Sequence, residues 1–153
     1  ALGSVNGTVQ EVVDDMRASG VPIGSVAICS FRPFPLAALR EALERARRVV
    51  VLEKCLAVGL GGIVSDGVRK SLSGIQLNGY TIIAGLGGRA ITQASLRRML
   101  LEAQAGKLPA LSFLDLDWRI VNRQLEREAQ MRRSGPIAEN LLRDVGTVAS
   151  EAS

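Results

Sequence analysis

The residues of this sequence that could bind a ligand or do chemistry lie in four short loops. Each loop follows a stretch of apolar residues and contains glycine or proline: residues 3–8, 30–35, 59–62 and 85–89. Backbone N–H groups and helix N-termini converge beyond the carboxyl ends of parallel strands, where α/β domains bind ligands. None of the four is a GxGxxG dinucleotide fingerprint or a Walker A loop. Taken singly, each loop is more typical of a tight turn than of a phosphate cradle.

Charged side chains accompany these loops. Arg32 and Arg89 stand at loop tips, where an arginine could clamp a carboxylate or phosphate with two hydrogen bonds. A structural ion pair, for instance with Glu53 or Asp66, is the slightly favoured alternative. Glu53 ends an apolar run, so it could act as a general base or, more simply, accept hydrogen bonds from the following loop. The candidate interface or ligand-loop residues are Arg32, Phe34, Gly61, Gly62, Gly87, Gly88, Arg89 and Trp118.

Composition excludes several kinds of catalysis. The chain has no histidine, which removes Ser-His-Asp triads, Cys-His pairs and His-ligated zinc. Cys29 and Cys55 have no CxxC neighbour, and we expect reduced, buried thiols in a cytoplasmic protein. A net charge of +4 is a mild basic bias and predicts no nucleic-acid partner. No apolar window approaches the roughly 20 residues of a membrane span, so no membrane partner is expected.

The elements that must position these loops follow an α/β pattern. The 153 residues suffice for one hydrophobic core. Short apolar runs rich in β-branched residues alternate with segments of helical period, which indicates a mainly parallel sheet covered by helices. The pattern predicts strands at 21–29, 48–53 and 79–85, and helices at 8–19, 36–47, 63–72 and 92–104, the last with Thr92 as N-cap and Gly106 as stop.

The start of the chain resembles the exit of a strand–helix unit. A helix near Thr8 follows a glycine-containing turn, and only Ala1 and Leu2 stand where a strand should precede it. We therefore expect a piece of a longer polypeptide whose first strand is absent or reduced to a stub. A natural N-terminus after Met removal is the alternative.

The pattern changes after Lys107. We predict that the core is complete by Gln104 and that the chain divides into an α/β domain, 1–106, and a C-terminal arm, 107–153. Residues 108–116 should be extended or turn, and 118–131 and 137–145 helical. Trp118, Val121, Leu125 and Ala129 form one apolar stripe. We expect this stripe to dock on the core or on a neighbouring subunit.

Several motifs together resemble one family. The Arg-Pro-Phe-Pro sequence at 32–35, Val-Leu-Glu at 51–53 followed by Gly61 and Gly62, and Gly-Leu-Gly-Gly-Arg-Ala-Ile-Thr at 85–92 occur in that order. Together with the tail at 132–140, they resemble the α subunit of pyruvate:ferredoxin oxidoreductase and related 2-oxoacid:ferredoxin oxidoreductases. Ala90 departs from the family pattern, which has Asp there.

The resemblance implies a fold similar to the transketolase C-terminal domain. That fold has three layers, helix–sheet–helix, and about five strands in the order 1-3-2-4-5, of which the first is antiparallel. The resemblance also implies that the parent enzyme uses thiamine diphosphate, magnesium and iron–sulfur clusters, acylates coenzyme A and reduces ferredoxin. The residues that hold those groups in the family lie in other domains and subunits, so no cofactor is expected in this chain.

The resulting prediction is a non-catalytic assembly domain of a 2-oxoacid:ferredoxin oxidoreductase, with pyruvate as the parent's substrate. Its partners would be the other subunits or domains of the enzyme. One alternative is an anion- or coenzyme A-binding module that uses the same loops. The other is the C-terminal domain of a different thiamine-dependent enzyme, transketolase-like or branched-chain dehydrogenase.

Overall fold

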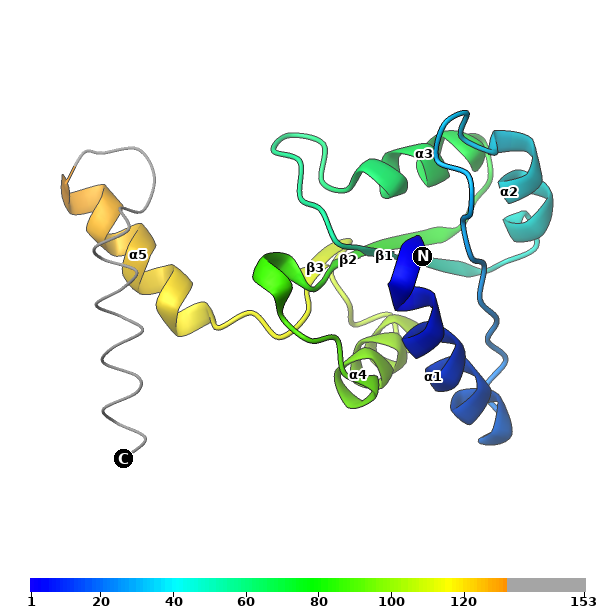
Figure 1. Cartoon of the computed structure of the whole chain (residues 1–153), viewed down its shortest axis with the longest axis horizontal. Helices are drawn as coiled ribbons and strands as arrows, with labels where there is room; N and C mark the ends of the chain where they lie inside the picture. The colour runs from blue at the N-terminus through cyan, green and yellow to red at the C-terminus, as the bar shows by residue number, and fades with distance from the viewer. Residues whose placement is uncertain (132–153) are drawn as a thin grey trace. The chain divides into compact units, whose positions relative to one another are not determined.

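The first compact unit of the chain, Ala1–Asp115, is built around a parallel β-sheet (Figure 1). The structure is a computed structural model, and it describes residues 1–131. Three strands lie side by side in the order β1 (Arg48–Glu53), β2 (Asn78–Ile83) and β3 (Leu111–Phe113). Both pairings are parallel, with Arg48 opposite Asn78 and Thr81 opposite Leu111. The α/β class predicted from the sequence is confirmed.

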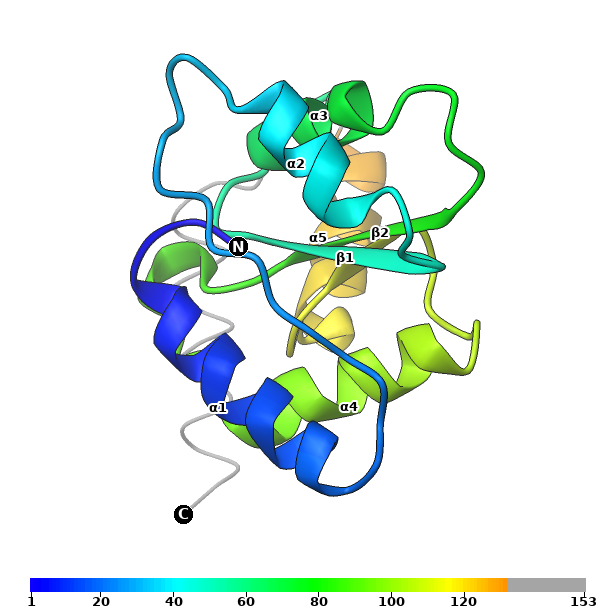
Figure 2. The ribbon, with the colours of Figure 1, turned by 90° about the vertical axis from the view of Figure 1, so that its right-hand side faces the viewer.

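Helices cover both faces of the sheet (Figure 2). On one face lie α1 (Asn6–Ala18) and α4 (Gln93–Gln104), and on the other α2 (Leu36–Leu43) and α3 (Ile63–Ser71). A strand buried on both faces must be apolar throughout, which explains the Val-Val-Val-Leu run of β1. The three-layer arrangement is therefore as predicted.

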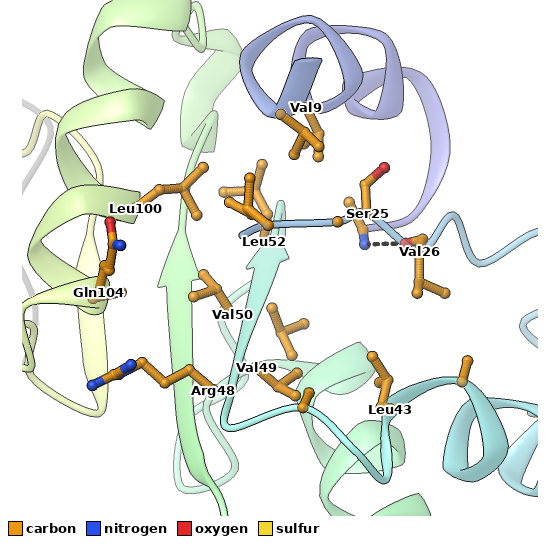
Figure 3. Close-up of a pocket in the computed structure, with 18 of the residues that line it drawn as sticks. Val9, Ser25, Val26, Leu43, Arg48, Val49, Val50, Leu52, Leu100 and Gln104 are labelled. Atoms are coloured by element: carbon orange, nitrogen blue, oxygen red, sulfur yellow. Dashed lines mark hydrogen bonds between the residues drawn. The ribbon is translucent and has the colours of Figure 1, made fainter. Parts of the chain in front are cut away.

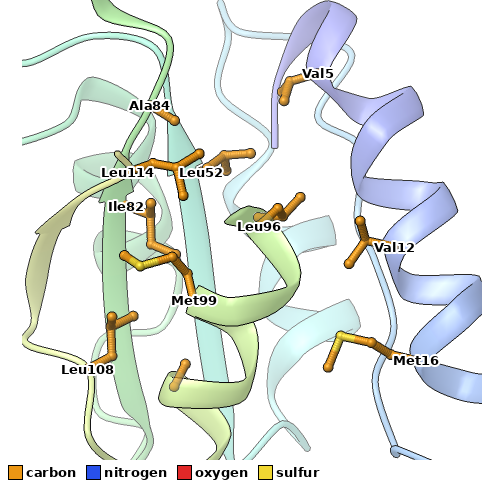
Figure 4. Packing of buried hydrophobic residues seen from close by; sticks show 11 residues of the cluster. Val5, Val12, Met16, Leu52, Ile82, Ala84, Leu96, Met99, Leu108 and Leu114 are labelled. Atoms are coloured by element: carbon orange, nitrogen blue, oxygen red, sulfur yellow. The ribbon is translucent and has the colours of Figure 1, made fainter. Parts of the chain in front are cut away.

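Each face of the sheet has its own hydrophobic cluster. Met16 of α1, Ile82 of β2 and Leu96 of α4 lie in the cluster on the α1–α4 side (Figure 4) and are at most 2% exposed. On the opposite side, Val49 and Val51 of β1 join residues of α2 and α3. The side chains of the sheet thus point alternately into the two clusters.

One predicted strand is wrong. Residues 21–29 form no ladder, and their only strand-like contact in the described part of the chain is a single parallel bridge between Leu2 and Ile28. A β-branched run becomes a strand only when a neighbouring edge pairs with it, and Ala1 and Leu2 are too short to do more. The described sheet therefore has three strands, all parallel, whereas the resemblance implied about five with one antiparallel.

The prediction that the core is complete by Gln104 is also wrong. Residues 108–116 were expected to be extended or turn, and part of this segment is strand β3, which pairs with β2. Leu108 and Leu114, on either side of β3, are buried in the α1–α4 cluster. A three-residue strand gives too short an alternating pattern to be recognised.

The helix boundaries follow the expected capping signals in part. Thr92 caps α4, because its Oγ1 accepts a hydrogen bond from the Ser95 N–H at 3.1 Å. Helix α1 begins at Asn6, before the expected cap at Thr8, and its N-cap Val5 makes no side-chain bond. Helix α2 ends at Leu43, four residues earlier than expected.

The second unit, which begins at Leu116, contains α5 (Trp118–Met131), with the bounds predicted from the sequence. Asp117 caps this helix, because its Oδ1 accepts hydrogen bonds from the backbone N–H groups of Arg119 and Ile120. The predicted helix at 137–145 lies outside the described residues. Within residues 1–131, no helix has the length and apolarity needed to cross a membrane.

Candidate functional site

The loops that follow β1, β2 and β3 meet at the carboxyl edge of the sheet. Because the strands are parallel neighbours, residues 54–62, 85–91 and 114–115 leave the sheet on the same side. Contact between two loops is direct: a Cβ on Gly85 would lie 3.3 Å from Lys54 Cε and 3.2 Å from Ile91 Cδ1. This edge is the region that the sequence indicated as the candidate site.

Glu53 is the one acidic residue that is buried among the described residues, and its carboxylate is hydrogen-bonded to α3. The residue is 3% exposed, and its Oε1 accepts hydrogen bonds from the Ser65 N–H at 2.6 Å and the Ser65 hydroxyl at 3.1 Å. Ser65 lies in the first turn of α3, whose positive dipole end favours a carboxylate. Glu53 is thus a hydrogen-bond acceptor, as the simpler interpretation held, but its donor Ser65 lies in α3 and not in the following loop.

Gly62 makes this arrangement possible. An ideal Cβ on Gly62 would overlap the carboxylate oxygen and carbon of Glu53. Its backbone φ of −103° is accessible to any residue, so space is the constraint. Gly61, by contrast, has φ +85° and nothing within 4 Å of its Cβ position. Of the two candidate glycines, Gly62 is needed for packing and Gly61 for the turn.

Phe34 is an anchor for the loop before α2. A Cβ on Gly67 of α3 would fall 2.5 Å from Phe34 Cζ, so the ring packs directly on the helix backbone. Phe31 meets Phe34 edge to face with 6.3 Å between ring centroids. The loop also contains a cis peptide bond between Arg32 and Pro33.

Arg32 does not make the predicted ion pair. Its guanidinium lies over the Phe31 ring, 4.4 Å from the centroid, and donates to the Phe31 carbonyl at 3.3 Å. Asp66, the expected partner, instead pairs with Lys70 at 2.6 Å. The stacking geometry is local, because Phe31 is the preceding residue in the chain. Arg32 is therefore held at the surface by its own loop.

Arg89 ties the loop after β2 to the end of β3. Its Nη1 donates to the Asp115 carbonyl at 2.5 Å, and Arg98 of α4 binds the Asp115 carboxylate at 2.7 Å. Arg89 was predicted to bind a carboxylate or carbonyl across a domain or subunit boundary. A carbonyl is indeed the acceptor, but it lies in the same compact unit. The ion pair predicted with Glu53 or Asp66 is wrong for this residue too.

Asp115 is a site residue that sequence reasoning missed. It adopts φ +51°, a left-handed conformation that Asp tolerates better than most residues. A hydrogen bond from the Ser95 side chain, followed by the Arg98 and Arg89 guanidiniums, holds the pKa of its carboxyl below the usual value against the opposing effect of burial. The only sequence signal was an acidic residue directly after an apolar run.

The glycines of the 85–89 loop are needed for its backbone. Gly85, Gly87 and Gly88 have φ values of +71°, +65° and +81°, which L residues rarely adopt. The loop turns through the short 3₁₀ segment η2 (Leu86–Gly88) before it reaches Arg89. This motif therefore sets the place from which Arg89 reaches Asp115.

Exposed apolar side chains lie on each of the two loops after β1 and β2, another feature that the sequence analysis did not identify. Val58 is fully exposed and is the first residue of the turn that a bridge between Ala57 and Gly61 closes. Leu56, Leu60 and Leu86 are each at least 40% exposed. We call Leu56, Val58, Leu60 and Leu86 the apolar loop patch. The signal in the sequence was an apolar run flanked by glycines where a solvent-exposed loop should be polar.

Both cysteines are exposed and free, so the prediction that they are buried is wrong. Cys29 ends the 21–29 segment, which forms no central strand, and Cys55 follows Glu53 in the loop. Each therefore lies just beyond the region where a strand side chain would be buried. Trp118 stands at the start of α5 and is 55% exposed. Its predicted docking on another chain stays a prediction.

The residues at the carboxyl edge do not fit thiamine diphosphate. The buried carboxylate that could activate a cofactor base, Glu53, is enclosed by Gly62 and Ser65. Within residues 1–131, no cluster of three Cys, Asp or Glu side chains could hold the magnesium ion that a diphosphate needs.

Comparison with known proteins identifies the same family that the motifs at 32–35, 51–53 and 85–92 resemble. Residues 1–96 match the family described as "Pyruvate:ferredoxin oxidoreductase core domain II". Pyruvate synthase subunit PorA of Thermotoga maritima is 37% identical over 72% of the chain, and PorA of Methanosarcina barkeri is 37% identical over 76%. Ketoisovalerate oxidoreductase subunit VorA of Pyrococcus horikoshii is 34% identical over 70%.

These relatives are much longer than the matched region. The alignments cover 29% of the Thermotoga protein, 31% of the Methanosarcina protein and 29% of the Pyrococcus protein. The family match spans well over half of this chain and includes Phe34, Glu53, Gly62 and Arg89. The chain belongs to the pyruvate:ferredoxin oxidoreductase core domain II family.

Proposed function

We propose that this chain is a structural, non-catalytic domain of a 2-oxoacid:ferredoxin oxidoreductase, and that the parent enzyme acts on pyruvate. The substrate class is supported by the relatives, which are named as pyruvate synthase and ketoisovalerate oxidoreductase subunits. Pyruvate is favoured because PorA names predominate among the relatives that match.

The state of Glu53 is the observation that carries the non-catalytic role. An acid–base residue must reach a reacting atom, and this carboxylate is enclosed and already accepts two hydrogen bonds from Ser65. Asp115 is engaged by Arg98, and Arg89 by a backbone carbonyl. The polar groups of the carboxyl edge therefore serve to fix the loops.

A fixed edge is what an assembly domain needs. Residues 54–62 and 85–89 present the apolar loop patch on a backbone held by Glu53 and Arg89. Apolar residues on ordered loops are typical of a surface that another protein covers. We propose that other domains or subunits of the oxidoreductase contact this patch, together with the candidate residues Arg32 and Trp118.

Thiamine diphosphate, magnesium, iron–sulfur clusters, coenzyme A and ferredoxin would then bind elsewhere in the complex. The exposed free thiols of Cys29 and Cys55 are compatible with a reducing compartment, and we propose the cytoplasm.

The test combines a titration with a reconstitution. Calorimetric titration of the purified chain with thiamine diphosphate and Mg²⁺ should give no saturable heat, and saturable micromolar binding would overturn the non-catalytic role. In the reconstituted oxidoreductase, Val58→Asp should weaken subunit association at least about tenfold, because a charge would be buried in the interface. The matched control Leu101→Asp, at an exposed leucine of α4, should assemble normally.

Equal assembly of both variants would remove the proposed role of the apolar loop patch. A raised Michaelis constant for coenzyme A in the Arg89→Ala complex, with assembly intact, would instead favour the anion-binding alternative.

A further inference from the structure

The loop after β1 contains an ordered turn, from Ala57 to Gly61. Two backbone hydrogen bonds join these residues, at 2.6 and 2.8 Å, and the Leu60 N–H donates to the Ala57 carbonyl at 3.1 Å. Arg69 of α3 donates to the Leu60 carbonyl at 3.1 Å and so ties the turn to the helix. Figure 1 shows this loop projecting away from the sheet between β1 and α3. Val58 is therefore held in one place although it is fully exposed.

Three exposed cations accompany this turn and the neighbouring loop. Lys54 begins the loop after β1, Arg89 ends the loop after β2, and Arg69 holds the turn. The position of a Cβ on Gly85 lies 3.3 Å from Lys54 Cε and 3.5 Å from the Arg89 carbonyl oxygen, so the two loops meet there. Within residues 1–131, none of these three cations forms an ion pair.

The acidic residues beside the loops do not balance these charges. Asp66 and Asp115 are each in an ion pair of their own, at 2.6 and 2.7 Å, and Glu53 is buried. The loops themselves, residues 54–62 and 85–91, contain no Asp or Glu. The face that they form therefore combines exposed apolar side chains with unbalanced positive charge.

These two properties together define the chemistry of a partner. Protein interfaces bury apolar residues at their centre and match opposite charges at their rim. A basic partner would place like charges against Lys54, Arg69 and Arg89. A nucleic acid would supply negative charge through its phosphates but little apolar surface to cover Val58 and Leu60. An acidic protein surface with an apolar centre satisfies both properties.

We propose that this face binds an acidic protein surface: Val58 and Leu60 enter an apolar recess, and carboxylates around the recess meet the three cations. The inference rests on the proposed assembly role and adds the chemistry of the partner, a neighbouring domain or subunit of the oxidoreductase. The apolar contacts should mainly set the dissociation rate, and the cations should mainly set the association rate.

Opposite charges at one position test the chemistry of the partner. In the reconstituted oxidoreductase at about 50 mM salt, Val58→Glu should weaken subunit association at least about tenfold more than Val58→Lys, because the glutamate meets carboxylates. At about 0.5 M salt the difference should fall below about threefold, because salt screens the repulsion. Val58 is fully exposed, so both variants should fold. The matched pair Leu101→Glu and Leu101→Lys, on α4, should associate alike.

Strand β1 offers a second comparison, because a cation stands at each of its ends. Lys54 follows the last residue of the strand, and Arg48 is the first, where it lines a cavity together with Gln104 of α4 (Figure 3). Lys54→Glu should slow association at least about fivefold at about 50 mM salt. Arg48→Glu changes the net charge equally and should slow it less than about twofold. Equal slowing by both variants would overturn the inference.

The outcomes separate this inference from the proposed function. If Val58→Glu and Val58→Lys weaken association equally, the loops contact another subunit whose surface is not acidic, and this inference alone is overturned. If neither has an effect, the assembly role of the apolar loop patch fails as well. A calorimetric titration with coenzyme A tests the anion-binding alternative. Saturable binding that Lys54→Glu abolishes, with assembly unchanged, would make this face a phosphate site and overturn the inference.

Discussion

Gly62 and Glu53 share one space at the carboxyl edge of the sheet: a side chain on Gly62 would stand where the Glu53 carboxylate lies. The absence of a Cβ lets the carboxylate reach Ser65 at the start of α3. A single small residue thus connects the end of β1 to the beginning of the next helix. Its substitution must move either the carboxylate or the loop.

Gly62→Ala should therefore destabilise the chain by about 1–3 kcal/mol, because the Glu53 carboxylate would lose its partners while still buried. The control is Gly7→Ala in the first turn of α1, where nothing lies within 4 Å of the Cβ position; there alanine should be neutral or stabilise by up to about 1 kcal/mol. Urea unfolding measures both changes. Equal midpoints for Gly62→Ala and the parent chain would refute the packing argument.

Phe34 and Gly67 should behave as a coupled pair. Gly67→Ala pushes a methyl group into the Phe34 ring, and Phe34→Ala removes the ring and leaves a gap; each should cost about 1–3 kcal/mol. The double variant should cost less than the sum by at least about 0.5 kcal/mol, because the ring that clashes is gone. A double-mutant cycle from chemical unfolding would test the contact, and strict additivity would argue against it.

Arg89→Ala should have a small effect on the isolated chain. The guanidinium is exposed and donates to one carbonyl, that of Asp115, so its loss should cost less than about 1 kcal/mol. Arg89→Lys should retain little of this contribution to stability, because an ammonium group lacks the planar set of N–H donors of the guanidinium. A large loss of stability on Arg89→Ala would mean that the 85–89 loop contributes far more to the core than its exposure indicates.

The lowered pKa of Asp115 predicts that the free energy of unfolding falls in acid. A carboxyl whose pKa is lowered in the folded state stabilises the protein above its unfolded pKa of about 3.9, and this contribution disappears as the pH falls through the folded value. Asp115→Asn keeps the left-handed backbone but cannot titrate. Its unfolding free energy should therefore fall less than that of the parent chain between about pH 5 and pH 2. Parallel curves would show that Asp115 does not contribute.

Two truncations should show whether folding of the chain depends on β3 or on the C-terminal helix. A chain that ends at Leu116 retains β3 and the buried Leu108 and Leu114 and should fold. A chain that ends at Lys107 loses them, and burial of two leucines alone is worth about 3–6 kcal/mol, so it should be largely unfolded. Circular dichroism and thermal unfolding would distinguish them. Normal folding of the shorter chain would support the original prediction of a core complete by Gln104.

The sequence predicted the elements whose local signals and tertiary partners agree. β1, α3, α4 and α5 lie within about two residues of their expected bounds, because apolar periodicity and capping residues act locally. Residues 21–29 failed because strand formation depends on a neighbouring edge, which no local pattern encodes. The contact between Arg89 and Asp115 joins residues 26 positions apart, and neither residue type alone identifies its partner.

The same distinction explains the candidate site. Glycines at turn spacing are a local sequence signal, so the sequence predicted the positions of the loops. Whether Glu53 is free or enclosed depends on what packs around it, and Gly62 decides that in three dimensions. The exposure of Cys29 and Cys55 likewise follows from where the sheet ends.

The register of the sheet also determines how long one strand must wait for its partner during synthesis on the ribosome. Arg48 pairs with Asn78, and Thr81 with Leu111, so every ladder joins residues 30 positions apart. At a synthesis rate of about 5–20 residues per second, β1 leaves the ribosome about 2–6 s before β2 can meet it. During that interval its Val-Val-Val-Leu run has two open edges, which makes this nascent segment a natural client for a chaperone that binds extended apolar polypeptide.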